Sequence, residues 1–370
     1  MSRLTQVHED HGATVTERGG HEVVAHYGRP ERAHQAVRNG VGVIEHGADV
    51  LVVTGEDRVA YVDNAISNNV PTTDHRGVYA LLLTPQGRIR TDMYVYNAGE
   101  RLLVVLPPGK GDPVGTEWSE KTFIQDVDIE VATDRFAVFG VHGPNATEKL
   151  ASVLTETTPE QHLRFVRGSL GDAGVTVVRT DGLTGEEGYE VICGAADARE
   201  VFDTLETRGL NAAPFGYHTW ETLTIEAGTP LFQSELDGAV PNNLGLHVAI
   251  DYEKGCFVGQ EVVSRVANRG RPTKQLLGLR TEAVPESDAA VFDGDENVGS
   301  VTRGCESPTL GEPVALALLD RGVDEQVGEA GALTVRVDGD ERPATAIKLP
   351  FVEGSDRSER LPGGETPTGD

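Results

Sequence analysis

The sequence of 370 residues contains few cysteines and no long apolar run. Its three cysteines, Cys193, Cys256 and Cys305, lie far apart and form no C-x-x-C pair. This spacing argues against a disulfide framework and against a cysteine zinc site, and it fits a reducing compartment. No apolar stretch is long enough to cross a membrane, and the first 20 residues lack the apolar core of a signal peptide. We therefore expect a cytoplasmic protein without a membrane partner.

Basic residues are also scarce, and lysine is the rarest of the charged types. The chain has 59 acidic and 32 basic residues, a net charge of −27, and only six of the basic residues are lysines. Such a field repels nucleic acid and anionic lipid, so we expect no nucleic-acid partner. A surface of this kind is typical of proteins from a high-salt cytoplasm, such as that of a halophilic archaeon, because molar salt shortens the Debye length to about 3 Å. An ordinary acidic surface is the alternative.

Several common site signatures are missing as well. The chain has no G-x-x-x-x-G-K-[ST], no complete G-x-G-x-x-G and no G-x-S-x-G, so nucleoside triphosphates, dinucleotides and serine hydrolysis are not indicated. Four of the 11 histidines fall within residues 8–26, in a polar segment without H-E-x-x-H spacing. We expect no metal site.

The apolar pattern divides the chain into regions. Up to about residue 275, β-rich runs such as 48–55 alternate with amphipathic helical segments such as 196–209, which predicts an α+β region. Residues 276–353 contain short strand candidates separated by Gly, Asp and Pro, which predicts a C-terminal β-barrel. Residues 354–370 are polar, acidic and rich in Gly and Pro, which predicts a disordered tail.

Two carboxylates stand beside apolar strand candidates. Asp92 precedes an alternating Met-Tyr-Val-Tyr run, where a carboxylate can exchange a proton with an amine nitrogen or make a local turn bond. Glu190 follows a Gly-rich turn and Tyr189 in an apolar context. A buried carboxylate there can accept two N–H donors from the edge of a heterocycle such as a pterin, and a solvated hairpin acid is the alternative.

The stretch DYEKGCFVGQEVVSRVANRG, residues 251–270, places a cysteine ahead of a predicted helix. Gly255 allows close backbone approach or a positive φ, and Gly259 allows a second tight bend. Lys254 and the positive end of the helix dipole favour a reactive thiolate. A buried, inert cysteine is the alternative.

Taken in order, these segments resemble the folate-binding superfamily that contains the glycine-cleavage aminomethyltransferase (T-protein) and the YgfZ-type proteins that support iron-sulfur enzymes. Residues 254–261 match the signature K-G-C-[FY]-x-G-Q-E in full, which indicates the YgfZ-type branch. GVHGPNATEKL and LTIEAGTPLFQSELD resemble further superfamily segments, so the resemblance covers nearly the whole chain.

The resemblance implies that residues 1–275 form two interleaved α+β subdomains arranged with the barrel in a ring, with tetrahydrofolate in the central channel. Asp92 then corresponds to a catalytic carboxylate near folate N10, and Glu190 to the carboxylate that holds the pterin. Cys256 becomes the second catalytic candidate. The remaining candidates for folate binding are Lys254, Gln260 and Arg265, the last beside the glutamyl tail.

Two positions depart from the T-protein pattern. Leu183 stands where T-proteins have a cofactor-contacting tyrosine, and Thr224 stands where they have an arginine. We therefore expect weaker or altered folate binding and little aminomethyl transfer. The favoured hypothesis is a tetrahydrofolate-binding protein that supports iron-sulfur cluster assembly or repair, with client or assembly proteins as partners. The alternatives are an aminomethyltransferase and a noncatalytic ligand-binding module with a structural cysteine.

Overall fold

The computed structural model describes residues 4–269, 272–323 and 327–362. A first, five-stranded sheet consists of β4 (Asp49–Thr54), β5 (Arg76–Leu83), β6 (Ile89–Asn97), β7 (Leu102–Leu106) and β8 (Asp128–Val131). Its strand order is β5-β6-β7-β4-β8, and every neighbouring pair is antiparallel.

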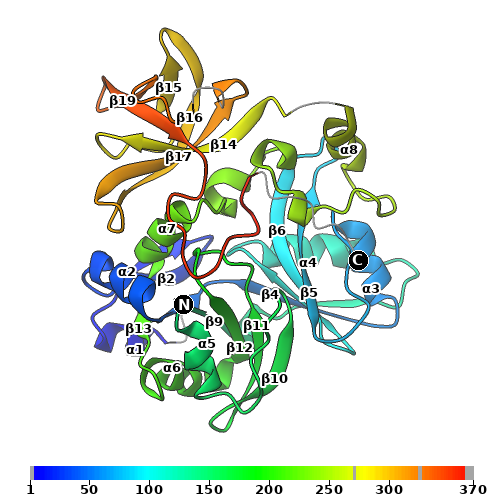
Figure 1. Cartoon of the computed structure of the whole chain (residues 1–370). Helices are drawn as coiled ribbons and strands as arrows, with labels where there is room; N and C mark the ends of the chain where they lie inside the picture. The colour runs from blue at the N-terminus through cyan, green and yellow to red at the C-terminus, as the bar shows by residue number, and fades with distance from the viewer. Residues whose placement is uncertain (1–3, 270–271, 324–326, 363–370) are drawn as a thin grey trace.

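A second sheet has six strands in the order β10-β11-β12-β9-β3-β13. Its strands are β3 (Gly42–His46), β9 (Phe136–His142), β10 (Phe165–Leu170), β11 (Ala173–Arg179), β12 (Gly188–Gly194) and β13 (Ala213–Pro214). β3 precedes the whole first sheet in the chain and β9 follows it, so the chain leaves the second sheet and later returns to it. The predicted α+β fold with interleaved halves is confirmed (Figure 1).

Side chains that alternate along the strands separate an inner core from two outer cores. In β4, Val50 and Val52 pack in the core shared by both sheets, whereas Leu51 and Val53 pack on the outer face of the first sheet. This follows from the two-residue period of a strand. The outer faces are covered by α3 (Arg58–Ala65) and α4 (Gly111–Glu120) on the first sheet, and by α1 (Thr5–Asp10), α5 (Ala146–Ala151) and α6 (Ala198–Thr207) on the second.

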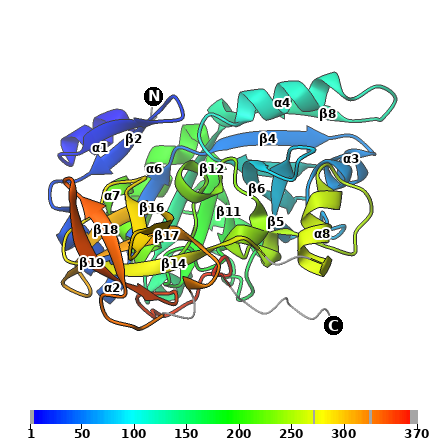
Figure 2. The ribbon, with the colours of Figure 1, turned by 90° about the horizontal axis from the view of Figure 1, so that it is seen from above.

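The C-terminal domain is a closed barrel in the order β14-β17-β16-β15-β18-β19. Figure 2 shows it at the side of the molecule opposite α4. Its strands are β14 (Lys274–Thr281), β15 (Ala290–Asp293), β16 (Glu296–Ser307), β17 (Glu312–Asp320), β18 (Leu333–Val337) and β19 (Asp340–Ile347). The barrel predicted from the short, turn-separated strands is therefore confirmed.

Three further elements connect these units. The hairpin of β1 (Thr14–Arg18) and β2 (His21–His26) packs on α7 (Tyr217–Glu226), and α7 also contacts α2 (Pro30–Asn39) and barrel strands β16 and β17. Within the three described ranges, no helix is long and apolar enough to span a membrane.

Residues 354–362, the C-terminal segment, differ from the predicted disordered tail. They form no helix or strand, but Ser358, Arg360 and Leu361 are buried. Asp356 accepts hydrogen bonds from Arg179 at 2.7 Å and from His162 at 3.2 Å, so ion pairs fix a segment whose composition is that of a disordered one. The rest of the predicted tail, 363–370, lies outside the described residues.

Candidate functional site

A cavity of ≈150 Å³ lies between the two sheets and α7. It is lined by side chains from β6, β12 and α7, by residues 105–108 and 231–234, and by Arg360 of the C-terminal segment. Two of the sequence-predicted site residues, Asp92 and Glu190, line it. The cavity therefore joins parts of both sheets with the end of the described chain.

β6 directs three polar side chains to one face, because Asp92, Tyr94 and Tyr96 are spaced by two residues. The Oδ2 atom of Asp92 accepts hydrogen bonds from the Tyr79 hydroxyl at 3.0 Å and from Arg360 Nη1 at 3.2 Å. Its Oδ1 atom is buried and has no partner among the described residues. Burial raises the pKa of Asp92, although Arg360 and Tyr79 oppose this. The carboxylate thus keeps one free acceptor at the cavity.

Arg360 supplies the positive charge at this end of the cavity. Its guanidinium lies 3.9 Å from the centre of the Tyr79 ring. It donates to Asp181 Oδ2 at 3.3 Å and to the Tyr94 hydroxyl, and that hydroxyl donates to Asp181 Oδ1 at 2.7 Å. One cation from the C-terminal segment therefore contacts two buried carboxylates, and its planar head is fixed by ring contact and hydrogen bonds.

Glu190 faces the same cavity from the second sheet. β12 pairs it with Val178 of β11 and Gly140 of β9, in the interior of the sheet. Its Oε2 atom accepts a hydrogen bond from the Tyr96 hydroxyl at 3.0 Å. Burial raises the pKa of Glu190 to about 7, while the Tyr96 hydrogen bond opposes the rise. Near neutral pH this carboxyl is divided between its protonated and ionised forms.

An uncharged aromatic wall completes the cavity. His46 and Trp220 both line it, with ring centres 4.9 Å apart in an edge-to-face arrangement. Burial lowers the pKa of His46 to about 4, so its ring is neutral at physiological pH. Leu183 also lines the cavity, where the T-protein pattern has a tyrosine, so this wall lacks one hydroxyl.

Thr224, the other departure from the T-protein pattern, is fully buried and does not line the cavity. Its hydroxyl accepts a hydrogen bond from Arg303 Nη1 at 3.0 Å, and Arg303 Nε donates to Glu235 Oε1 at 2.9 Å. Arg303 belongs to β16, so the barrel places a guanidinium beside Thr224. It is held by Glu235 and lies outside the cavity lining.

Lys254 lies in a different part of the molecule. Its ammonium group donates to the backbone oxygens of Asp63 at 2.6 Å, Asn68 at 2.8 Å and Ile66 at 3.2 Å. It also forms an ion pair with the Asp63 carboxylate at 3.3 Å. All these partners lie at the end of α3 and in the turn that leads to β5, so the lysine secures that turn.

The rest of the K-G-C segment also contacts the first sheet. Gly259 has φ +84°, and a Cβ there would lie 2.6 Å from the backbone oxygen of Thr84, which requires glycine. Gln260 begins α8 (Gln260–Arg269) and donates to the Lys254 backbone oxygen at 3.1 Å. Cys256 is exposed, and Arg265 is exposed and ion-paired with Glu261.

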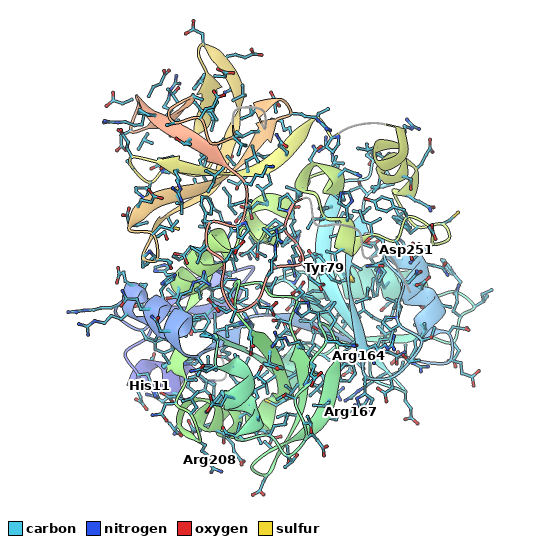
Figure 3. All side chains as sticks on the ribbon, in the orientation of Figure 1. His11, Tyr79, Arg164, Arg167, Arg208 and Asp251 are labelled. Atoms are coloured by element: carbon cyan, nitrogen blue, oxygen red, sulfur yellow. The ribbon has the colours of Figure 1, made fainter. Side chains whose placement is uncertain are left out.

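The structure therefore separates the predicted site residues into two groups. Asp92 and Glu190 lie together at the cavity, whereas Lys254, Cys256, Gln260 and Arg265 do not line it. Figure 3 labels one contact of each group: Tyr79, which donates to Asp92, and Asp251, which accepts from the Lys254 backbone N–H.

Sequence reasoning missed Tyr79, Tyr94, Tyr96, Asp181 and Arg360. The alternation after Asp92 was a usable signal for Tyr94 and Tyr96, since a strand places them on the face of that carboxylate. No local signal pointed to Arg360, because its partners are distant in the chain.

Fold and cavity define a class of protein: two interleaved halves, each built on one β-sheet, that enclose a carboxylate-lined cavity and are followed by a six-stranded barrel. Residues 4–254 match the GCVT N-terminal domain, and residues 274–353 match the glycine cleavage T-protein C-terminal barrel domain. The chain therefore belongs to the glycine cleavage T-protein family.

Similar proteins agree with this assignment over nearly their full length. An aminomethyltransferase of Saccharopolyspora erythraea is 32% identical, with 94% of this chain and 96% of that protein covered. An aminomethyltransferase of Bacillus subtilis is 28% identical, with 95% and 98% covered. The crystal structure of the glycine cleavage system aminomethyltransferase T from Bartonella henselae has the same fold, with a TM-score of 0.84 and 21% identity over 96% of this chain and 98% of that one.

Proposed function

We propose that the protein is a tetrahydrofolate-dependent aminomethyltransferase whose folate site is the cavity at Asp92 and Glu190. The observation that carries the proposal is the buried Asp92 Oδ1, an acceptor without a partner among the described residues, beside a second buried carboxylate. The aminomethyltransferases to which the chain is similar support the reaction class. The hypothesis favoured from sequence, support of iron-sulfur cluster assembly, is thus replaced by its first alternative, aminomethyl transfer.

The cavity residues fit a reduced folate. A pterin edge offers adjacent N–H donors, and Glu190 offers a carboxylate acceptor on the same lining as Trp220. The neutral His46 adds no charge next to a flat heterocycle. Leu183 provides apolar contact where a tyrosine would add a hydrogen bond, so we expect weaker binding than in a chain with that tyrosine.

Tetrahydrofolate, when bound, supplies the nitrogen that accepts the one-carbon unit. Asp92 Oδ1 holds or takes a proton at the cavity, while Tyr79 and Arg360 fix the orientation of the carboxylate through Oδ2. Because burial raises the pKa of Asp92, the group is more basic than an exposed aspartate. Arg360 limits that rise and keeps the ionised form accessible.

The test is Asp92→Asn, with Asp128→Asn as the matched control on an exposed strand of the same sheet. Given tetrahydrofolate and an aminomethyl donor, the native protein should form methylene-tetrahydrofolate. Asp92→Asn should slow transfer by about 10²- to 10⁴-fold, the range for loss of a general acid–base group, with folate affinity little changed. Absence of transfer by the native protein, or full transfer by Asp92→Asn, would contradict the proposal.

A second candidate function is the YgfZ-type support of iron-sulfur enzymes, with iron-sulfur client or assembly proteins as partners. The full match to the K-G-C signature and the exposure of Cys256 favour it. In this candidate the thiol acts at the surface while Asp92 and Glu190 bind folate. The source would be a halophilic archaeon, a proposal that rests on the charge composition alone.

Thiol labelling tests the second candidate. Cys256 should react first with iodoacetamide in the native protein, because Cys193 is buried and burial raises the pKa of Cys193 and of Cys305 to about 12. Cys256→Ala should preserve folate affinity and reduce the activity of iron-sulfur enzymes in cells that depend on this protein. Unchanged iron-sulfur activity would remove the thiol, and with it the second candidate.

A further inference from the structure

A second pocket, of ≈470 Å³, lies outside the folate cavity between the barrel and the N-terminal region. Its walls include residues of the 3₁₀ helix Pro241–Leu244, of β14 and of the C-terminal segment. We call it the cationic pocket, because its charged lining residues are Lys274, Arg321, Lys348 and Arg357 and its described lining contains no carboxylate.

This clustering runs against the composition of the chain. With 59 acidic and 32 basic residues, four cations without an acid in one pocket are an exception, and two of them are among the six lysines. Lys274 pairs with Asp320 at 3.5 Å. Within the described ranges, the side chains of Arg321, Lys348 and Arg357 have no ion pair or hydrogen bond. Arg321, Lys348 and Arg357 are exposed, and like charges near one another repel, so an anion bound among them is favoured.

Two amides in the lining point to a ligand independently of the charge. Asn242 is 5% exposed, and its Oδ1 atom has no hydrogen-bond partner among the described residues. The Nε2 atom of Gln275 is buried and equally unpartnered. Buried polar atoms in native proteins nearly always have partners. Both residues line the cationic pocket, so one unpartnered donor and one unpartnered acceptor belong to its walls.

We propose that the cationic pocket binds a small oligoanion that carries at least one hydroxyl or N–H donor. Phosphate and carboxylate groups both suit Arg321, Lys348 and Arg357. The Gln275 amide would donate to an anionic oxygen, and Asn242 would accept from the donor on the ligand. This site goes beyond the proposed transferase activity and does not depend on it.

The cationic pocket and the folate cavity share one segment of the chain, residues 354–362. Arg357 lines the cationic pocket and Arg360, three residues later, lines the folate cavity. Both belong to the C-terminal segment, which also holds Asp356 between His162 and Arg179. An anion bound at Arg357 stabilises the segment that carries Arg360 to Asp92. Ligand binding at the two sites is therefore coupled.

The experiment is isothermal titration of the full chain with pyrophosphate and, separately, with citrate, at constant ionic strength in KCl. We expect one site per chain for at least one of these anions. Tighter pyrophosphate binding would indicate a phosphate-bearing ligand, and tighter citrate binding a carboxylate one. The double variant Arg321→Gln/Lys348→Gln should weaken binding by about tenfold, since each lost contact to an exposed charge is modest.

The matched control is Arg342→Gln, which removes an exposed arginine of the same barrel outside the pocket. It should leave binding unchanged. Binding of neither anion by the native protein, or an equal loss in the control and the double variant, would overturn the proposal. Thermal melting verifies that all variants are folded, and bound anion should slow hydrogen exchange in residues 354–362. Unaltered exchange in a chain that binds the anion would overturn the coupling.

Discussion

Glu190 and Asp92 differ in how the protein balances their charge. Arg360 contacts Asp92 directly, whereas the hydrogen bond to Glu190 comes from the neutral Tyr96. Burial therefore dominates at Glu190 and raises its pKa to about 7. The same residue type exposed to water has an ordinary pKa near 4.5. At the scale of single residues, the neighbour decides whether a carboxyl is ionised at neutral pH.

We predict that folate affinity depends on pH through Glu190. The folded pKa is raised, so the protonated form persists up to about pH 7, and the N–H donors of a pterin require the ionised form. Affinity should rise by about tenfold per pH unit below 7 and level off above it. Folding stability should also fall as the pH rises from about 4.5, the ordinary pKa of a glutamate, to about 7. In this range the unfolded chain has lost the Glu190 proton while the folded protein retains it.

Glu190→Gln provides the control for this prediction. At pH 8 it should weaken folate binding by about 1–3 kcal/mol, the range for a charge-assisted contact left incomplete. Below pH 6 the native and variant affinities should converge. Fluorescence titration with tetrahydrofolate from pH 5.5 to 8.5 measures both curves. Parallel curves would mean that another group causes the pH dependence.

At the scale of elements, the end of α7 joins the barrel to the N-terminal region. Glu226 is fully buried there and accepts hydrogen bonds from His34 at 2.9 Å, from Arg38 at 2.8 Å and from Ser307 of β16 at 2.6 Å. Burial alone would raise the pKa of Glu226, but the His34 hydrogen bond and the Arg38 charge lower it to about 2. One carboxylate thus connects α2, α7 and the barrel.

Glu226→Gln should lower the free energy of unfolding by about 1–3 kcal/mol at pH 7, because it removes one of the two carboxylates that pair with the buried Arg38 and leaves only Glu186. The folded pKa is depressed, so the ionised group stabilises the fold above its ordinary value near 4.5, and this contribution is lost as the pH falls through about 2. Urea unfolding at pH 7 and pH 3 measures the difference, which should be smaller at pH 3. Glu221→Gln, on the same helix and half-buried, should change stability by less than about 1 kcal/mol. Equal losses in both variants would contradict the role of Glu226.

At the scale of the whole molecule, the surface charge opposes folding in dilute buffer. The net charge of −27 is distributed over a chain whose cores are assembled from ordinary apolar residues. Self-repulsion is long-ranged, and salt removes it without altering the local ion pairs of the interior.

We therefore expect the ligand-free protein to melt at a higher temperature in 2 M KCl than in 50 mM KCl, as measured by circular dichroism. The ligand must be absent from both samples, because folate would raise the melting temperature by mass action. An equal or lower melting temperature in 2 M KCl would remove the high-salt proposal and leave an ordinary acidic surface.

Local pattern predicted the elements of this protein well. The two-residue alternation after Asp92 predicted a strand, and short turn-separated strands predicted the barrel. Gly259 was expected to allow a tight bend, and its φ is +84°. These features depend on backbone geometry within a few residues, so the local sequence determines them.

Only the tertiary structure decided the charges at the site and the positions of the two predicted groups. Arg360 meets Asp92 across 268 residues of chain, from a segment whose composition predicted disorder. Lys254, a predicted folate contact, holds the turn after α3 through three backbone oxygens and does not line the cavity of Asp92 and Glu190. Ion pairing and burial act through space, and their partners come from strands and loops far apart in the chain. The sequence alone identified Asp92 as a candidate site residue. The fold brings Arg360 into contact with it and so places a positive charge beside the carboxylate.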